Sequence, residues 1–452
     1  MRTALSAVQW AMFILAGSVV APLAIGQAYG LTPQEIAEFV QRTLFVLGIV
    51  SILQALFGHR LPIMEGPAVL WWGVFLLFAQ LSSGMGMGLL DILKAFELGL
   101  LASGVIFLLM SFFKWMEPVR KLFTPTVIGT YFLLLVAQMS GPFLNGILGT
   151  SSQTVNWSAS AISLATLIVA ITLARSRNGL LRSFSVLIAI VFGWSLFALA
   201  GLYHPFDSQT GGWFSLPKLF VWGWPEWNGA ILFTSFLVTL LLLSNLMASV
   251  EAVEKVVKTD ETADRNRSVL VMGGSQMLSG VFSTVGFVPL SYTAGFILTT
   301  KMKEKLPFLL GSLLLLLISF FPPVTMWFAS IPVPVGYASV FLSFANMIGM
   351  GLKELADTGL DERNRYVVGI SLMTGMGSMF LPAAFLSQLP AFISPLASNG
   401  LLVGVFTCIL LEQATKVRDD AGAGVKRTKP TVYRSGSEWL DRVEETRNKW
   451  SR

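Results

Sequence analysis

FGHRLPIMEGP, residues 57–67, interrupts an apolar stretch of this chain with glycine, proline and charged side chains, and VGFVPLSYTAG, residues 285–295, does the same with glycine, proline and hydroxyl groups in the second half. Irregular backbone at membrane depth is tolerated only where protein or a watery cavity satisfies its polar groups. One such interruption in each half of a multi-span chain is the best sequence pointer to a transporter's substrate site. The two stretches therefore predict a carrier.

The composition places the whole chain in the membrane class. Of its 452 residues 54% are hydrophobic and only 12% are charged, whereas soluble domains carry about 25% charged residues. A helix needs about 20 apolar residues to cross the hydrocarbon, and this rule predicts about 14 transmembrane segments in an all-α fold. The third and tenth segments, residues 62–83 and 287–300, contain the two interruptions and are predicted to be part strand.

The basic residues predict the orientation, because Lys and Arg concentrate in cytoplasmic connections. Assigning alternate connections to the cytoplasm accounts for all 31 Lys and Arg residues except Arg42, Lys94 and Lys218. Both termini are then cytoplasmic. Two units of about seven spans would be inverted relative to each other, because seven is odd. The predicted parts are a first repeat at 1–203, an external connection at 204–229, a second repeat at 230–415 and a charged cytoplasmic tail at 416–452.

Charge and chemistry argue against other classes of protein. The net charge of +6 follows from a basic cytoplasmic face, so no nucleic-acid partner is expected. The single cysteine, Cys408, forms no disulfide within the chain, and the two histidines, His59 and His204, fall on opposite sides of the predicted membrane. His59 is expected at the membrane interface. No metal or other cofactor is predicted, and the alternative of an integral-membrane enzyme lacks a catalytic cluster of His, Asp or Glu at one membrane face.

Several motifs carry a family resemblance from the first predicted span onward. They are Gln9-Trp10, LPIMEGPAV at 61–69, Gly273 through Leu278-Ser279-Gly280, YTAGFILTTK at 292–301 and IPVPVG at 331–336. With these motifs the chain resembles a divergent bacterial member of the uracil/xanthine permease family, also called nucleobase-ascorbate transporters or nucleobase:cation symporters of type 2. The resemblance implies a nucleobase substrate, with xanthine or uric acid ahead of uracil, symport in the cell membrane, and a possible homodimer.

Two departures from the family pattern concern its carboxylates. The family places an acidic residue in the eighth span where this chain has Asn245. In the tenth span, Tyr292-Thr293 stands where the family has Gln/Glu-Asn. Both usual acidic positions are therefore neutral. H⁺ is the predicted coupling ion, and Na⁺, uncoupled facilitation and a different small anion as cargo remain alternatives.

A nucleobase is flat, with hydrogen-bonding groups along its edge and apolar faces. The predicted substrate-binding residues are Gly66, Val69, Asn245, Tyr292, Thr293 and Gly295. Asn245 offers a donor and an acceptor, Tyr292 and Thr293 offer hydroxyl groups, and the two glycines let backbone N–H groups approach; Val69 comes from the family motif. The alternative is that Asn245 and Tyr292 only tie helices together.

Glu65 is the predicted site of proton coupling. An ionised side chain at the centre of a span costs about 2.5–3.5 kcal/mol by insertion scales, so such residues usually face a cavity and have a function. Glu65 would bind a proton or accept a hydrogen bond from a base nitrogen. The alternative is a carboxylate that caps a helix restarting at Gly66-Pro67. Gln9 is predicted to support the site, or else to make a contact between helices, and close helix packing explains Gln276 and Ser279.

Overall fold

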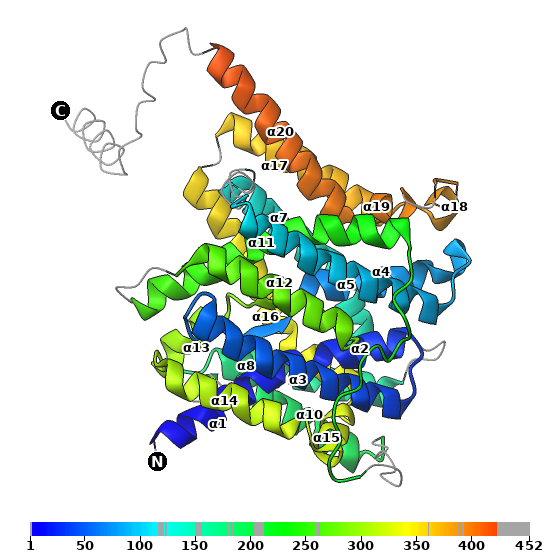
Figure 1. Cartoon of the computed structure of the whole chain (residues 1–452), viewed down its shortest axis with the longest axis vertical. Coiled ribbons are helices and arrows are strands. Elements are labelled where there is room, and N and C mark those ends of the chain that lie inside the picture. The colour runs from blue at the N-terminus through cyan, green and yellow to red at the C-terminus, as the bar shows by residue number, and fades with distance from the viewer. Residues whose placement is uncertain are drawn as a thin grey trace, which may run out of the picture. The chain divides into compact units, whose positions relative to one another are not determined.

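The structure is a computed structural model that describes residues 2–115, 122, 124–149, 156–178, 181–182, 184–202, 212–258, 263–359, 361–386, 388–390 and 393–422. These residues are mainly helical, with two short strands (Figure 1). The elements are α1 (Arg2–Ser18), α2 (Val20–Ala28), α3 (Pro33–Phe57), β1 (Glu65–Pro67), α4 (Val69–Met85), α5 (Leu89–Phe112), α7 (Pro125–Leu148), α8 (Trp157–Ala174), α10 (Ser185–Leu199), α11 (Gly229–Val257), α12 (Arg265–Val281), β2 (Phe287–Pro289), α13 (Thr293–Thr300), α14 (Lys305–Ile318), α15 (Pro322–Ala329), α16 (Val333–Thr358), α17 (Glu362–Met379), α18 (Ala383–Leu386), α19 (Ser394–Ser398) and α20 (Gly400–Gly422).

The chain divides into two compact units. The first, Met1–Ile409, contains every element from α1 to α19 and the start of α20. The second, Leu410–Arg452, is described only as far as residue 422, where α20 ends. The predicted charged tail beyond residue 422 lies outside the described residues. The candidate site lies in the first unit.

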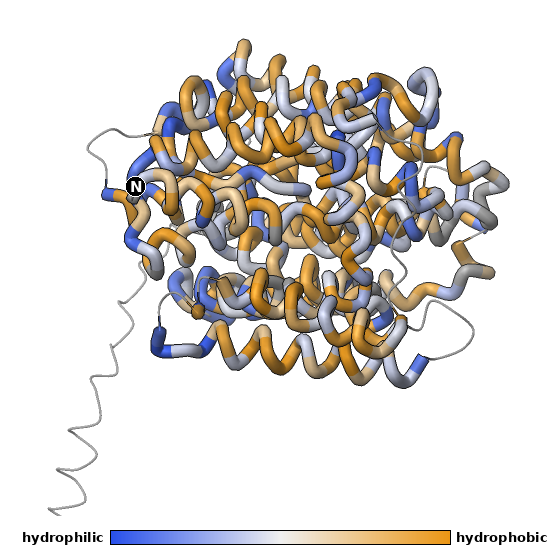
Figure 2. Tube along the Cα trace, turned by 90° about the horizontal axis from the view of Figure 1, so that it is seen from below, coloured by the Kyte–Doolittle hydropathy of each residue, from blue (hydrophilic) through white to orange (hydrophobic). Residues whose placement is uncertain are grey.

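The lengths of the helices test the predicted number of spans. In the described part of the chain, six helices are long and apolar enough to cross a membrane, and α14 with α15, bent by 98°, would make a seventh. Shorter apolar helices lie at Val69–Ala79, Ser185–Leu199 and Gly400–Thr415. Figure 2 shows apolar residues along most of the helical chain. These findings agree with a protein that crosses the membrane several times, and they do not confirm a count of 14.

Within the first unit the helices pack in two groups. In one group α5 packs against α11 and α12, while α3 packs against α12 and α14, and α14 packs against α1. In Figure 1, α3 lies between α12 and α14. In the other group α16 packs against α7, α8 and α10, and α7 also contacts α17. The two broken segments join the first group, because β2 contacts α11 and α12 and β1 contacts α1 and α3.

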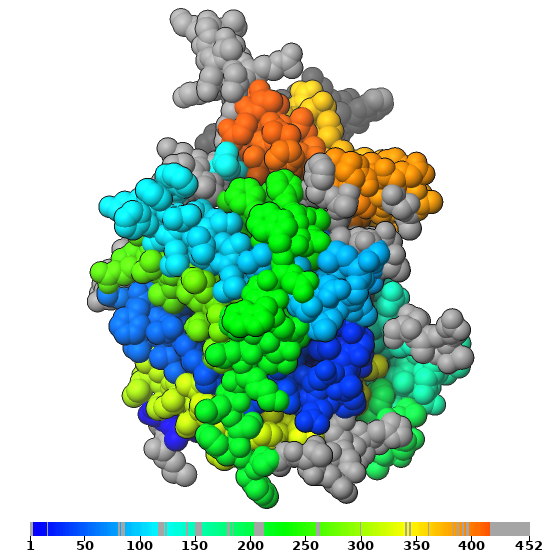
Figure 3. All heavy atoms as spheres, turned by 45° about the vertical axis from the view of Figure 1, so that its right-hand side comes forward, coloured from blue at the N-terminus to red at the C-terminus, as the bar shows by residue number. Residues whose placement is uncertain are grey.

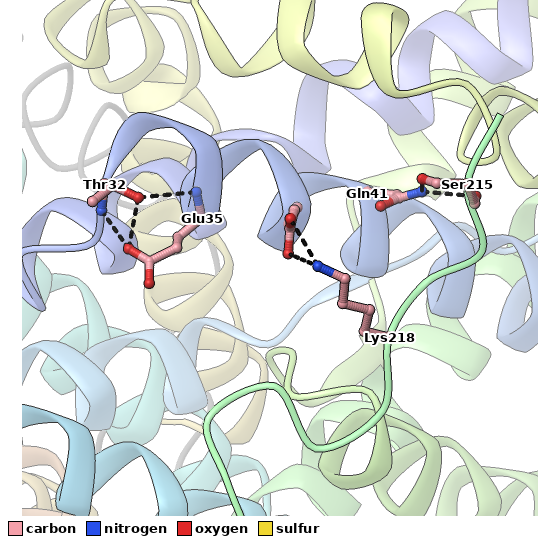
Figure 4. A network of polar contacts seen from close by, with 6 residues as sticks. Thr32, Glu35, Gln41, Ser215 and Lys218 are labelled. Atoms are coloured by element: carbon pink, nitrogen blue, oxygen red, sulfur yellow. Dashed lines mark hydrogen bonds and ion pairs between the residues drawn. The ribbon is translucent and has the colours of Figure 1, made fainter. Parts of the chain in front are cut away.

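Local sequence signals explain where the helices begin. The side chain of Thr32 accepts a hydrogen bond from the backbone N–H of Glu35, and the Glu35 carboxylate accepts one from the N–H of Thr32 (Figure 4). This reciprocal capping box satisfies two N–H groups at the start of α3, and Pro33 follows at the first helical position, where a missing N–H costs nothing. α7 begins with a simpler signal: the Thr124 side chain accepts a hydrogen bond from the backbone N–H of Val127, and Pro125 is the first helical residue.

Glycines allow α5 and α12 to approach closely. A Cβ atom on Gly104 would lie 2.7 Å from the carbonyl oxygen of Gly273 and 3.0 Å from the backbone nitrogen of Met277. Small residues that bring backbones together are a common means of helix association in membranes. The sequence analysis expected close helix packing around Gln276 and Ser279 of α12, and the approach of α5 to α12 at Gly104 and Gly273 agrees with it.

Replacing Gly104 with alanine is therefore expected to destabilise the protein. The added methyl group meets backbone atoms, which can move away only if the helices separate, and overpacking of this kind costs about 1–3 kcal/mol. Thermal unfolding of the detergent-solubilised protein, followed by size-exclusion chromatography, measures the effect. Gly274→Ala is the matched control, since its Cβ would meet no atom within 4 Å and alanine favours a helix. Equal unfolding temperatures for the two variants would contradict this account.

Candidate substrate site

The two interruptions meet as a pair of antiparallel strands. Their register pairs Glu65 with Pro289, Gly66 with Val288 and Pro67 with Phe287. The pairing extends at both ends, because Leu290 donates its N–H to the carbonyl of Met64 over 2.9 Å, and Ala68 donates to Gly286 over 2.8 Å. Each broken segment therefore satisfies backbone groups of the other, as buried irregular backbone requires. The predicted part-strand character of the two segments is confirmed.

A helix of the second half faces this strand pair. α11 contacts both β2 and α13, and α1 contacts β1. Four segments that are distant in the sequence, α1, β1, α11 and the β2–α13 segment, therefore surround one place in the first unit. Three of these four segments carry five of the six predicted substrate-binding residues, and the sixth, Val69, lies on α4.

Tyr292 and Thr293 both reach the first broken segment. Thr293 is fully buried, and its hydroxyl oxygen accepts a hydrogen bond of 3.3 Å from the backbone N–H of Met64. The Tyr292 hydroxyl group lies 3.7 Å from the sulfur of Met64. A Cβ on Gly17 of α1 would lie 2.6 Å from the Tyr292 oxygen and 2.7 Å from the terminal methyl of Met64. The absence of a side chain at Gly17 therefore leaves room for Tyr292.

Aromatic rings from α1 and α13 form a wall beside Tyr292. The rings of Phe13 and Phe296 stack with centroids 4.0 Å apart and an interplanar angle of 18°. Phe13 meets Tyr292 edge to face at 5.8 Å, and Trp10 lies 4.6 Å from Phe296. Flat apolar surfaces next to hydroxyl and amide groups match the faces and edge of a planar heterocycle. We define Phe13, Tyr292 and Phe296 as the aromatic wall.

Asn245 lies in the middle of α11, with 8% of its surface exposed. Its side-chain oxygen accepts a hydrogen bond of 3.1 Å from the Ser249 hydroxyl, one turn further along the same helix. An amide oxygen has two lone pairs and the NH₂ group has two hydrogens. Asn245 therefore retains hydrogen-bonding capacity on a helix that borders β2 and α13.

The remaining predicted residues differ in their surroundings. At Gly66 a Cβ would collide with a terminal methyl group of Leu290, so a side chain there would require Leu290 to move. Gly295 is exposed, and a Cβ there would meet no atom within 4 Å. Val69 is half-buried at the first turn of α4. Gln9 is half-buried on α1, four residues before Phe13, which places both residues on one face of the helix.

Glu65 lies apart from the aromatic wall. Side chains alternate across a strand, so Glu65 points to the opposite side of β1 from Met64, which faces Tyr292. The Glu65 carboxyl group is fully buried, 3.5 Å from Nε2 of His59. Among the described residues neither carboxyl oxygen has a hydrogen-bond partner. Glu65, which the sequence singled out, is therefore a buried ionisable residue, and the structure places His59 next to it.

The prediction that His59 lies at the membrane interface is wrong. His59 is 1% exposed, and its Nδ1 accepts a hydrogen bond of 3.0 Å from the backbone N–H of Leu61. This bond leaves Nε2 as the protonated nitrogen of a neutral ring, directed at Glu65. The chain turns back after α3 and buries the imidazole, which a span-by-span interpretation of the sequence does not anticipate.

A second polar link holds β2 in place, and the sequence did not predict it. The Gln276 side chain accepts a hydrogen bond of 3.0 Å from the Trp71 indole N–H and donates one of 2.7 Å to the carbonyl of Phe287. It therefore joins α12 to both α4 and β2. The sequence predicted only close packing for Gln276.

Among the described residues, no three His, Cys, Asp or Glu side chains are grouped to hold a metal ion.

Phe13 and Gly17 are site residues that the sequence interpretation missed. Trp10, Phe13 and Gly17 follow one another at intervals of three and four residues, which places them on one face of α1. That spacing could have indicated an aromatic face opposite a broken span. The spacing does not by itself show that the Tyr292 ring occupies the space next to Gly17.

Comparison with known proteins now identifies the family. The family model Xan_ur_permease, described as Permease family, matches residues 1–384. YwdJ, a proposed purine permease of Bacillus subtilis (strain 168), is 40% identical over 423 residues, covering 91% of this chain and 96% of its own. The xanthine permease of the same organism is 23% identical over 436 residues, covering 93% and 97% of the two chains.

A solved structure shows the same fold. The transmembrane domain of a cyanobacterial bicarbonate transporter, BicA, superimposes with a TM-score of 0.58 over 91% of this chain and 97% of that chain, at 14% sequence identity. At this identity the likeness concerns the fold alone. The matches to permeases are matches to transport proteins and not to enzymes. This chain belongs to the permease family and is a multi-pass membrane transporter.

Proposed function

We propose that this protein carries a purine base, xanthine or uric acid rather than uracil, across the cell membrane by alternating access. The observation that carries the proposal is the aromatic wall next to Thr293, where the two broken segments meet and α11, the helix that carries Asn245, contacts β2 and α13. A purine ring would stack on an aromatic face while its edge reaches the polar groups. The names of the similar permeases support the same substrate class.

The proposal includes the arrangement in the membrane. Fourteen spans in two inverted repeats, with both termini in the cytoplasm, would place β1 and β2 at equivalent positions of the two halves. The antiparallel pairing of the two strands supports such a relation. One helix group would rock against the other around the site, and a homodimer is the assembly that the family resemblance implies.

We assign proton coupling to Glu65. The Glu65 carboxyl group is buried without a hydrogen-bond partner among the described residues, and the ring of His59 lies 3.5 Å from it. An unpartnered buried carboxyl group is costly to keep in place, which supports a functional role. Because Glu65 faces away from the aromatic wall, coupling would act through the position of β1 and not by direct contact with the base. The proton site and the substrate site would thus lie on opposite sides of β1 and would not form one pocket.

Uptake of radiolabelled xanthine and uric acid into cells lacking their own purine permeases tests the proposal, with and without a protonophore. The wild type should show saturable uptake that collapses with the protonophore. Glu65→Gln, which keeps the neutral shape of the side chain, should retain exchange of internal for external base but lose accumulation against a gradient. Glu251→Gln, at an exposed position of α11, is the matched control and should behave as wild type.

Each result separates two parts of the proposal. If the surface-expressed wild type takes up neither base, the substrate class is wrong. If uptake is saturable but survives both the protonophore and Glu65→Gln, the base is right and proton coupling is wrong. Dependence of that uptake on external Na⁺ would then identify the coupling ion, and its absence would indicate facilitated diffusion.

A further inference from the structure

Two charged side chains are buried far from the aromatic wall in sequence, on α3 and α5. Arg42 is 2% exposed and Glu97 is 0% exposed. Burial of ionised groups inside a membrane protein is expensive, so such residues pair with one another or perform a function. The sequence offered no explanation for Arg42, which did not fit the cytoplasmic distribution of basic residues.

Both side chains converge on one turn. Arg42 donates from Nε to the carbonyl oxygen of Ser283 over 3.3 Å, and the Glu97 carboxylate accepts a hydrogen bond from the Ser283 hydroxyl group. The neighbouring residue is held as well, because the hydroxyl groups of Thr43 and Thr284 lie 2.9 Å apart. Side chains of α3 and α5 thus hydrogen-bond to two consecutive residues of the turn, Ser283 and Thr284.

The turn determines where β2 begins. Ser283 follows the end of α12 by two residues and precedes β2 by four. Its φ of +47° is in the left-handed region, which a residue other than glycine adopts only when its surroundings hold it there. From this point a short extended run leads to β2 and then to Tyr292 and Thr293. A shift of the turn would therefore move the second half of the candidate site.

The segment 212–228 covers the turn. Val221 donates its N–H to the Ser283 hydroxyl oxygen over 2.8 Å, and Phe220 donates its N–H to the carbonyl of Val281, at the end of α12, over 2.9 Å. The Trp222 ring is 4% exposed and packs edge to face against Phe39 at 5.5 Å. In the space-filling view the green chain that contains this segment lies over the blue surface formed by the first part of the sequence (Figure 3).

The same segment is fastened at points on both sides of Trp222. Lys218 lies 3.2 Å from the Glu38 carboxylate, and Gln41 donates to the carbonyl and hydroxyl oxygens of Ser215 (Figure 4). Beyond Trp222, Lys94 contacts Glu226 over 2.7 Å. These outer contacts hold the segment without touching the Ser283 turn.

We propose that Arg42 and Glu97 are positioning residues for the transported base. They hold the Ser283 turn in place under the segment 212–228. The turn determines the position of β2 and therefore of Tyr292 and Thr293, which follow it. The inference rests on the proposed function, because it assigns the binding of a purine to the end of β2. It differs in predicting that residues on α3 and α5, remote from the aromatic wall, control the affinity for substrate.

Transport kinetics with radiolabelled xanthine test the inference. Glu97→Ala should raise KM about tenfold, as expected from the loss of a hydrogen bond to a charged group, while Vmax per surface-exposed molecule changes less than about threefold. Glu97→Gln should restore KM to within about twofold, because its amide oxygen still accepts from Ser283. Glu226→Gln, which releases only an outer contact of the covering segment, is the matched control and should keep the wild-type KM.

Hydrogen–deuterium exchange provides a readout that does not depend on transport. In purified Glu97→Ala, the amides of residues 284–292 should exchange about tenfold faster than in wild type, while those of α7 and α16 remain unchanged. Unchanged exchange at 284–292 would overturn the inference even if no purine were transported. A fall in Vmax with KM unchanged, or a uniform increase in exchange over all helices, would also overturn it, because both indicate a general structural role.

Discussion

Gly17→Ala is expected to reduce xanthine uptake about a hundredfold while the protein remains folded and reaches the membrane. The new methyl group would lie 2.6 Å from the Tyr292 hydroxyl oxygen and 2.7 Å from the terminal methyl group of Met64. Met64 can change rotamer, but the Tyr292 ring is rigid and lies edge to face with Phe13. Tyr292 must therefore turn or retreat, and misplacement of about 1 Å in a binding constellation can cost a factor of about a hundred.

Uptake of radiolabelled xanthine, normalised to surface expression, measures the loss. Gly349→Ala in α16 is the matched control, since its Cβ would meet no atom within 4 Å and Gly349 is exposed. Tyr292→Phe on the Gly17→Ala background removes the oxygen that the methyl group meets and should recover part of the uptake. If Gly17→Ala transports like the wild type, Gly17 and Tyr292 do not approach each other in the working protein.

Gln276→Leu is expected to lower the free energy of unfolding by roughly 2–6 kcal/mol. Leucine fills a similar volume but leaves the Trp71 indole N–H and the Phe287 carbonyl oxygen without the partner that each has in Gln276. A buried group that loses its only partner costs about 1–3 kcal/mol, and two groups are affected. Transport should fall with stability, because Phe287 is the first residue of β2.

Thermal unfolding of the detergent-solubilised protein measures this effect. Ser279→Ala, three residues along α12, is the matched control: the Ser279 hydroxyl group donates only to the carbonyl of Ser275 in its own helix, so the variant should unfold close to the wild-type temperature. Adding Trp71→Phe to Gln276→Leu removes one of the two unpaired groups and should recover part of the loss. A Gln276→Leu protein as stable as Ser279→Ala would show that this link contributes nothing.

The sequence predicted the two broken segments because their signal is local. Proline and glycine inside an apolar stretch mark irregular backbone wherever that stretch lies, and the structure confirms extended backbone at 65–67 and 287–289. The predicted site drew residues from both segments, but the sequence did not predict that the segments pair as strands. Tyr292 and Thr293 were among those residues, and both contact Met64.

The orientation of Glu65 was within reach of the sequence but depended on strand periodicity. Once 64–66 is taken as extended, Met64 and Glu65 must point in opposite directions, and only one of them can face Tyr292. Its partner His59 was not predictable in this way, because the turn after α3 brings the imidazole back into the interior. The close approach at Gly17 depends on the distance between two segments about 275 residues apart, which periodicity does not contain.

The number of spans was harder to predict than the two broken segments for a physical reason. Hydropathy measures the length of an apolar run, but it does not tell whether the helix bends, as α14 and α15 do by 98°. Short helices such as α10 (Ser185–Leu199) fall below the length of a full span although they are apolar. Helix ends in this protein are set by caps, prolines and partners from distant segments, to which a sliding window is insensitive.

The pairing of β1 with β2 has a consequence for how the protein is made. β1 leaves the ribosome about 220 residues before β2. During synthesis the backbone N–H and C=O groups of β1 are therefore inserted before their hydrogen-bond partners in β2 exist. Until β2 arrives, water, lipid headgroups or an insertion factor must occupy those groups. A nascent chain that stops before residue 287 should therefore be recognised as unfinished and degraded, and the two halves expressed as separate polypeptides should be stable only together.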